Sequence, residues 1–215
     1  MRNVRLIYKK SGRARYISHL DINRLFSRVL KRSGLPVWYT EGFNPHIFVT
    51  FALPLSLGFE SEYDICDFRL DDESISNEKV LEVLKNAFPE SIEVVNVIDP
   101  LMKVKELTFA EYNVKIDCDK QMAEKLKGVL NAEEIIVEKT TKHKKTQTFD
   151  VKPKIKRMNI TETEDGILVN LLLPAGSIEN INPTIIFEKV WESADFEISS
   201  VKRGKLYDKN MQLFH

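Results

Sequence analysis

The chain has 215 residues with 32 basic and 32 acidic side chains, so its formal net charge at pH 7 is zero. Hydrophobic residues make up 43% of the chain, as in ordinary globular proteins, and the length allows one large domain or two small ones. No run of about 18 apolar residues occurs, which excludes a membrane-spanning helix, and the first ten residues lack the apolar core of a secretory signal. Two cysteines, Cys66 and Cys118, suit a cytoplasmic setting and cannot form a metal cluster by themselves, so we expect no cofactor.

The first half of the chain predicts the element order β-α-β-β-α-β. The apolar spacing changes between the period of two that is typical of strands and the i, i+3, i+4 spacing of an amphipathic helix. The predicted elements are a strand at 3–9, a helix from Ser18 to just before Gly34, a strand at about 47–53, a strand at about 62–70, a helix at 77–88 and a strand at 92–98. Pro100 and the polar residues after it mark a domain boundary.

The second half repeats this order with an insertion. The predicted elements are strands at 112–118 and 134–140, a helix at 120–130, hairpin strands at about 155–162 and 166–174, a helix at 183–193 and a last strand at 196–203. We therefore predict an α+β protein of two tandem ferredoxin-like (βαββαβ) lobes with antiparallel sheets. The lobes are expected at 1–100 and 106–215, and the second carries an extra basic hairpin within the inserted segment 139–157.

The zero net charge conceals three charged blocks. Residues 1–33 hold ten basic and one acidic side chain, residues 60–99 hold three basic and twelve acidic, and residues 139–157 hold eight basic and one acidic. Partners respond to the local electric field, so the local balance is more informative than the total. Two interpretations are open: the blocks attract one another across the fold, or the basic blocks bind phosphates while the acidic block faces away.

The segment 13–24, RARYISHLDINR, places cations around the start of the first predicted helix. Backbone N–H groups and the helix dipole favour an anion at such a position, although Ser18 and Asp21 also fit a simple capping role. His19 is a candidate phosphate donor or general acid/base. The candidate RNA- or phosphate-binding residues of this region are Arg13, Arg15, Ser18, His19, Arg24, Arg28 and Arg32, of which the last three recur every fourth residue along one helix face.

The segment EGFNPH, residues 41–46, predicts a loop with binding potential. Gly42 and the Asn-Pro pair are turn formers, so a tight loop shaped by its own backbone is one interpretation. The loop also presents Glu41, Phe43, Asn44 and His46, and a ring beside ionisable groups is able to hold an unstacked base. These four residues are the other candidate RNA-binding residues in the first half of the chain.

The basic segment 139–157 is a third candidate region. Its predicted RNA-contacting residues are Lys142, Lys144, Lys145, Lys152 and Arg157, which surround a single aromatic residue. Lysines on a hairpin can also serve only solvation or the protection of a sheet edge. Arg203 is a minor candidate, and the absence of an HxxxH or HExxH spacing leads us to predict no metal site.

The segments GRARYISHLD, RLFSRVLKRSGLPVWYTEGFNPH and FALPLSLGFESEYDICDFRL resemble the radical-SAM-linked protein family, a bacterial domain of unknown function. Its members occur alone or fused behind a cobalamin-binding radical-SAM protein. The resemblance is dense over residues 5–70, and FDVKPKI at 149–155 is similar to the family's Asp-basic-Pro signature. Ile47 departs from the family's usual His-Pro. The resemblance implies a radical-SAM partner but no particular reaction.

We therefore expect a cytoplasmic RNA-binding accessory protein that presents tRNA or rRNA to a radical-SAM enzyme, rather than an enzyme itself. One alternative is a metal-independent RNA-processing or RNA-modifying enzyme that uses His19 or His46 as acid/base. Another is a protein-only adaptor, whose acidic 60–99 stretch docks a basic partner. The first two hypotheses depend on whether the candidate residues of the first half come together in space.

Overall fold

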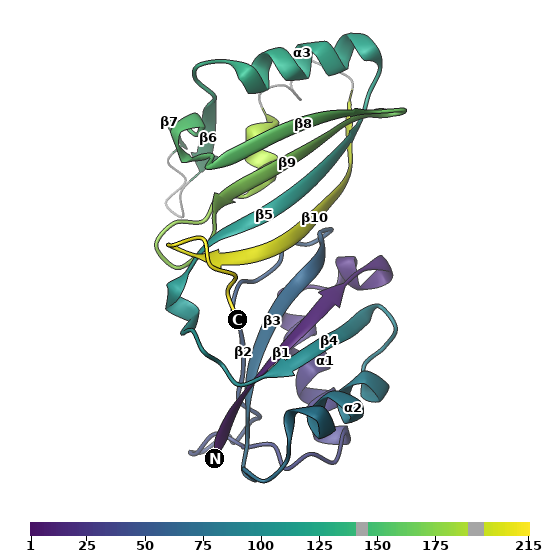
Figure 1. Ribbon diagram of the computed structural model, residues 1–215, viewed down its shortest axis with the longest axis vertical. Helices are drawn as coiled ribbons and strands as arrows, with labels where there is room; N and C mark the ends of the chain where they lie inside the picture. Colours follow the sequence, from purple (N-terminus) through teal and green to yellow (C-terminus); the bar gives the residue numbers. More distant parts are fainter. Residues whose placement is uncertain (141–145, 189–195) are drawn as a thin grey trace. The chain divides into compact units, whose positions relative to one another are not determined.

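The structure is a computed structural model that describes residues 1–140, 146–188 and 196–215 (Figure 1). The chain divides into two compact units. Unit 1 comprises Met1–Leu107 with Gln212–His215, and unit 2 comprises Thr108–Met211. No helix in the described part of the chain is long and apolar enough to cross a membrane.

Unit 1 is built on a small antiparallel sheet. Its strands, in sheet order, are β4 (Ile92–Ile98), β1 (Arg2–Lys10), β3 (Glu60–Leu70) and β2 (Val49–Phe51). Leu6 of β1 lies opposite Cys66 on one side and opposite Val97 on the other. The four predicted strands of this half are therefore confirmed, although β2 is shorter than expected.

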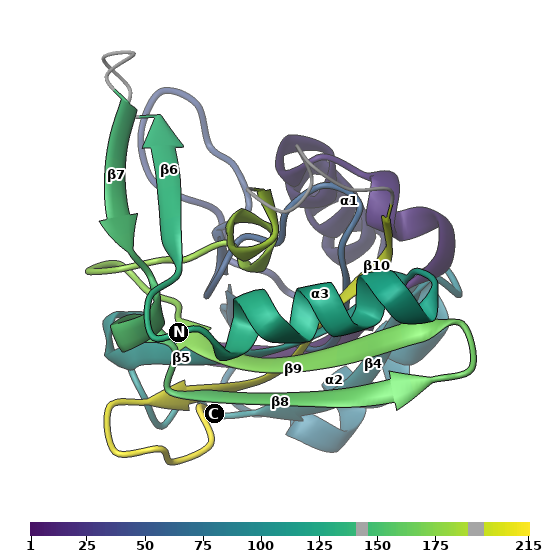
Figure 2. The same cartoon turned by 90° about the horizontal axis from the view of Figure 1, so that it is seen from above.

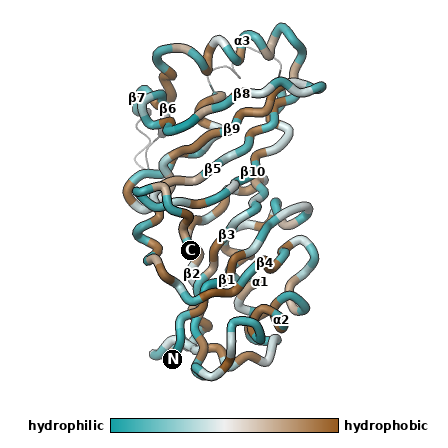
Figure 3. The backbone as a smooth tube through the Cα atoms, viewed as in Figure 1, coloured by the Kyte–Doolittle hydropathy of each residue, from teal (hydrophilic) through white to brown (hydrophobic). Residues whose placement is uncertain are grey.

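Two helices, α1 (His19–Arg32) and α2 (Asn77–Ala87), pack on one face of this sheet. Both are labelled in the second view of the chain (Figure 2). Phe26 of α1 is fully buried, and its ring lies 4.9 Å from that of Tyr8, 5.0 Å from Phe51 and 4.7 Å from Phe88. One side chain thus contacts β1, β2 and the end of α2. Figure 3 shows the apolar residues of unit 1 alternating with polar ones along the strands.

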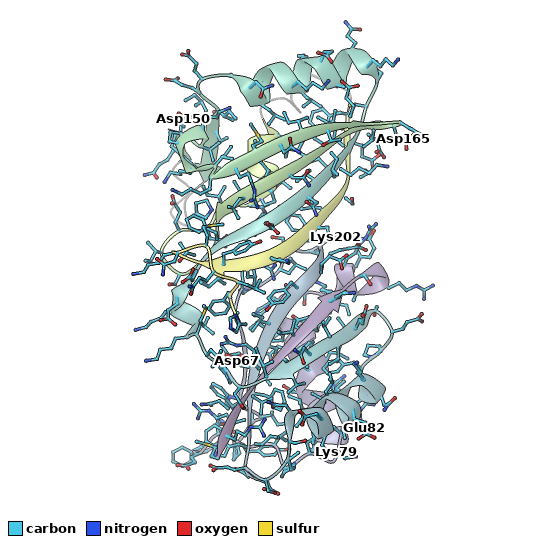
Figure 4. The ribbon with its side chains drawn as sticks, in the orientation of Figure 1. Asp67, Lys79, Glu82, Asp150, Asp165 and Lys202 are labelled. Atoms are coloured by element: carbon cyan, nitrogen blue, oxygen red, sulfur yellow. The ribbon has the colours of Figure 1, made fainter. Side chains whose placement is uncertain are left out.

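A charged pair occupies the opposite face of the sheet. Arg5 of β1 lies directly across from Asp67 of β3, and its Nε and Nη2 donate to the two carboxylate oxygens, each at 2.7 Å (Figure 4). Arg5 is 1% exposed, and the ring of Phe214 lies 4.9 Å from its guanidinium. This two-pronged geometry offsets the cost of removing both charges from water.

The C-terminal residues Gln212–His215 belong to unit 1 because they pack there. The hydroxyl of Tyr63 donates to the carbonyl of Phe214 at 3.0 Å, and Met102 N–H donates to the carbonyl of His215 at 3.2 Å. The sequence placed the division at 100–106 and left these residues with the second lobe. Their position follows from contacts between residues about 150 apart, which no local pattern encodes.

Unit 2 also has an antiparallel sheet, with a hairpin beside it. Its strands, in sheet order, are β10 (Glu197–Asp208), β5 (Leu107–Asp117), β9 (Gly166–Pro174) and β8 (Arg157–Thr163). Helix α3 (Lys120–Asn131) follows β5, and β6 (Ile136–Thr140) pairs with β7 (Thr146–Asp150) in a separate two-stranded ladder. The mixed α+β class with antiparallel pairing is thus confirmed.

The predicted helix at 183–193 is described only at its beginning. Residues Pro183–Ile186 form a short 3-10 helix, opened by Asn182, whose side chain accepts the N–H of Thr184. The remainder of the prediction, from 189 onward, lies outside the described residues. The extra hairpin predicted for the inserted segment is present as β6 and β7, although the bounds of β7 were not predicted because its polar residues resemble a loop sequence.

Breaking the Arg5–Asp67 pair should destabilise unit 1. Asp67→Asn leaves the guanidinium buried and uncompensated, so we expect a loss of about 3–5 kcal/mol in urea unfolding followed by circular dichroism. The apolar double variant Arg5→Met/Asp67→Leu should recover most of that loss. The exposed Lys79–Glu82 pair on α2 supplies the control, Lys79→Ala, with a much smaller effect. A cost for Asp67→Asn no larger than that of the control would contradict a stabilising role for the buried pair.

Candidate nucleic-acid interface

The start of α1 is fixed by Ser18, which acts as a helix cap. Its Oγ accepts the N–H of Asp21 at 3.2 Å and donates to the Asp21 carboxylate at 2.7 Å. Asp21 also accepts from Arg24 at 3.1 Å. The hydrogen bond from Ser18, followed by that from Arg24, lowers the pKa of the Asp21 carboxyl. Ser18 therefore positions the helix, and the capping alternative accounts for its side chain.

His19 borders a very small pocket at the same end of α1. Its ring packs edge-on against Phe51, with centroids 5.5 Å apart, and the buried side chains of Lys10 and Asp64 lie in the same wall. Ile17 and Ile22, which flank the cap residue, close another side of the pocket. Its volume is about 10 Å³, which is room for a single water molecule and far too little for a base.

The EGFNPH loop is closed by bonds between its two ends. Thr40 N–H donates to the carbonyl of His46 at 2.8 Å, and His46 N–H donates to the Thr40 hydroxyl at 3.1 Å. The Nδ1 atom of His46 also lies 3.1 Å from the Asn44 carbonyl. Gly42 has a φ of +124°, which favours glycine, and Phe43 at the tip is fully exposed. The loop therefore exposes the Phe43 ring at its tip while its two ends are held together by hydrogen bonds. Glu41 in the same loop is also exposed.

The two histidines belong to different local arrangements. Among the described residues, no hydrogen bond or ring contact joins His19 to His46. His19 contacts Phe51 of β2, whereas His46 lies in the loop before that strand, with four residues of chain between His46 and Phe51. The hydrogen bonds and ring contacts described for the two histidines therefore do not join them around one reacting group.

The exposed side of α1 carries four cations, of which one forms an ion pair. We call the exposed side chains of Arg24, Arg28, Lys31 and Arg32 the α1 basic face. Arg24 pairs with Asp21, whereas Arg28, Lys31 and Arg32 form no ion pair with any part of the chain that the structure describes. The apolar side of the same helix is buried against the sheet, so these cations are directed towards solvent.

The cations of β1 are arranged differently. Besides the Arg5–Asp67 pair, Lys9 lies 3.2 Å from a Glu93 oxygen and Arg2 lies 3.1 Å from an Asp99 oxygen. Carboxylates of the acidic block at 60–99 thus form ion pairs with the cations of β1. The interpretation that the charged blocks attract one another therefore holds for β1. Within the basic block 1–33, as far as the structure describes the chain, the cations of β1 are paired, whereas most cations of α1 are not.

Arg13 and Arg15 lie in the 3-10 helix η1 (Gly12–Tyr16), which leads to α1. Arg13 is exposed, and the guanidinium of Arg15 lies 4.7 Å from the ring centroid of Tyr16. Tyr16 was not predicted as a site residue. Its position just after two arginines and just before the helix cap is a sequence signal that could have identified it. Its exposure leaves one ring accessible beside the Arg15 guanidinium.

The described candidates of unit 2 are engaged within that unit. Lys152 donates from Nζ to the Leu130 carbonyl at the end of α3, at 2.6 Å, and Arg157 pairs with Glu111 at 2.6 Å. Arg203 is buried at 2% exposure. The predicted residues Lys142, Lys144 and Lys145 lie outside the described residues.

The signature-like segment 149–155 has a structural explanation. Asp150 accepts the backbone N–H of Ile135 at 2.8 Å and that of Lys152 at 3.0 Å, which fastens the end of β7 to the start of β6. This carboxylate therefore holds the inserted hairpin at its base. Within the described residues, no group of three or more His, Cys, Asp or Glu side chains is arranged to hold a metal ion.

Comparison with known families identifies the chain. The family model described as "Uncharacterized protein conserved in bacteria (DUF2344)" matches residues 3–183. The chain belongs to this family. No curated protein matches the sequence.

Among solved structures, the chain is similar to one chain of "Crystal Structure of a Cbf5-Nop10-Gar1 Complex". The TM-score is 0.49 and the identity is 10%, over 94% of this chain and 48% of the other. This chain thus spans about half the length of that relative. We base no functional argument on so distant a likeness.

The cap at Ser18 predicts a linked change in stability and titration. Ser18→Ala should destabilise unit 1 by about 1 kcal/mol in urea unfolding, whereas Ser18→Asn should retain most of the cap. The Asp21 pKa, which is lowered in the native protein, should rise in Ser18→Ala when measured by carboxyl NMR titration. Because the native pKa is lowered, the stabilisation from Asp21 is present above its unfolded-state pKa and disappears as the pH falls through the folded-state value. An unchanged Asp21 titration in Ser18→Ala would contradict this assignment.

Proposed function

We propose that this protein binds RNA, such as tRNA or rRNA, through the α1 basic face and Arg13, and presents it to a radical-SAM enzyme that modifies it. The observation that supports RNA binding is the contrast between the two halves of the N-terminal basic block. The cations of β1 are paired with carboxylates, whereas Arg28, Lys31 and Arg32 are exposed without such partners in the described part of the chain. A radical-SAM partner is supported by the sequence resemblance over residues 5–70.

The spacing on α1 suits a polyanion. Residues four apart on a helix are displaced by about 6 Å along its axis, so Arg24, Arg28 and Arg32 form a row about 12 Å long. An arginine presents several donors in a flat fork that matches phosphate oxygens. Binding that replaces condensed counterions should weaken steeply as salt is added.

We also propose that the two units are tandem ferredoxin-like lobes. In unit 1 the element order β-α-β-β-α-β and the sheet order β4-β1-β3-β2 support this. In unit 2 the sheet order β10-β5-β9-β8 is equivalent once the β6–β7 hairpin is treated as an insertion. Such a fold is compatible with many functions, so the proposal of RNA binding depends on the α1 basic face and not on the fold.

The two alternatives have less support. An RNA-processing role for His19 or His46 needs a histidine beside a space that admits a nucleotide, and the His19 pocket, at about 10 Å³, has room only for a water molecule. An adaptor that docks a basic partner on residues 60–99 needs free carboxylates. Several in that block, including Asp67 and Glu93, already pair with β1.

Charge reversal on α1 should remove RNA binding. Arg28→Glu/Arg32→Glu should weaken binding of total tRNA at low salt at least ten-fold in a filter-binding assay. It should also make the slope of log K against log salt about two units shallower, because each lost phosphate contact removes roughly one unit.

The matched control is Lys85→Glu/Lys105→Glu, which changes the net charge equally at exposed lysines of unit 1 outside α1. This control should keep near-native affinity. Equal losses in both variants would show a response to net charge only and would contradict a site on α1. If the native protein binds no RNA even at low salt, the proposed function is wrong.

A further inference from the structure

The exposed aromatic residues of the described chain all flank α1. Tyr16 is 63% exposed, Tyr39 is 40% exposed and Phe43 is fully exposed. Tyr16 lies three residues before the first residue of α1, and the other two lie in the segment that follows the helix. Every other aromatic residue in the described ranges is buried or half-buried. The exposed rings therefore lie in the segments directly before and after the helix that carries the unpaired cations.

Tyr16 is held as a platform by its neighbours. The Arg15 guanidinium lies 4.7 Å from its ring centroid, a distance typical of a cation stacked on a ring. The backbone of this turn is fixed, because Ala14 is fully buried and the Arg15 carbonyl accepts the N–H of Gly58 at 2.8 Å. Since much of Tyr16 stays exposed, a second flat group can stack on it without rearrangement of the turn.

Phe43 lies at the tip of a loop that is closed by backbone pairing. Hydrogen bonds between Thr40 and His46 join the two ends of the loop, and an isolated β-bridge joins the next residues outward, Tyr39 and Ile47. A ring on such a closed loop loses little conformational entropy when it is covered by a ligand. A fully exposed phenyl ring contributes nothing to the packing of the fold, so its contribution to binding can be tested without loss of stability.

We propose that the RNA is bound as an unpaired single strand, with bases stacked on Tyr16 and Phe43 while the α1 basic face contacts its phosphates. This inference rests on the proposed function and specifies its substrate class. Bases in a duplex are stacked on one another and offer no free face to a protein ring, whereas unpaired bases do. Rings beside cations are the combination that proteins use to hold single strands with little sequence preference. A surface that contacted phosphates alone would gain nothing from exposed rings.

The test compares two RNA probes with the full-length chain by fluorescence anisotropy at fixed low salt. One probe is a labelled mixed-sequence single strand of about 12 nucleotides, within the usual range of single-strand sites, and the other is the same sequence as a blunt duplex. The native protein should prefer the single strand. Tyr16→Ala and Phe43→Ala should each weaken single-strand binding roughly five-fold to a hundred-fold, the usual effect of losing one stacked base, and leave duplex binding unchanged.

Two further variants separate stacking from general apolar contact. Tyr16→Phe retains the ring and should keep native affinity for the single strand, whereas Leu101→Ala removes an exposed apolar side chain elsewhere in unit 1 and should have no effect. Equal binding of the duplex, or ring truncations no more harmful than Leu101→Ala, would overturn the inference while RNA binding by α1 remained valid. Failure of both probes to bind would overturn the proposed function itself and this inference with it.

Discussion

The charge distribution of unit 1 depends on ion pairs between β1 and the strands beside it. Arg5 and Asp67 face each other across β1 and β3 in a buried two-pronged contact, and Lys9 reaches Glu93 on β4. A basic central strand between acidic neighbours is favourable because opposite charges directly across a sheet attract each other. Part of the acidic block thus pairs with β1, whereas none of the ion pairs described for that block involves a cation of α1.

The packing of the hydrophobic core determines where the cations of α1 lie. Phe26 holds α1 against β1, β2 and the end of α2, and the Ser18 cap fixes where the helix begins. A helix that buries one side must expose the other, so Arg28 and Arg32 are directed to solvent by the same packing that stabilises the unit. An apolar contact in the core therefore determines the orientation of the proposed phosphate-binding surface. The segments before and after α1 expose the rings of Tyr16 and Phe43, which is why we infer an unpaired RNA strand.

The sequence was most informative where the pattern is local. The helix from Ser18 to Gly34 and the strand 92–98 follow from periodicity and end signals, and the structure confirms both. The Arg5–Asp67 pair and the return of Phe214 to unit 1 depend on contacts distant in sequence, which periodicity does not encode. Among site residues, the exposure of the α1 arginines followed from helical spacing. The separate surroundings of His19 and His46, and the internal partners of Lys152 and Arg157, required coordinates.

The most direct test of this account is ultraviolet cross-linking of the full-length chain to total tRNA, with the attachment sites located by mass spectrometry. The account predicts cross-linked peptides within residues 13–43, which span η1, α1 and the loop that carries Phe43. Attachment confined to residues 139–157, or to the acidic 60–99 block, would contradict it. In that case the unpaired cations of α1 would be an ordinary solvated helix face.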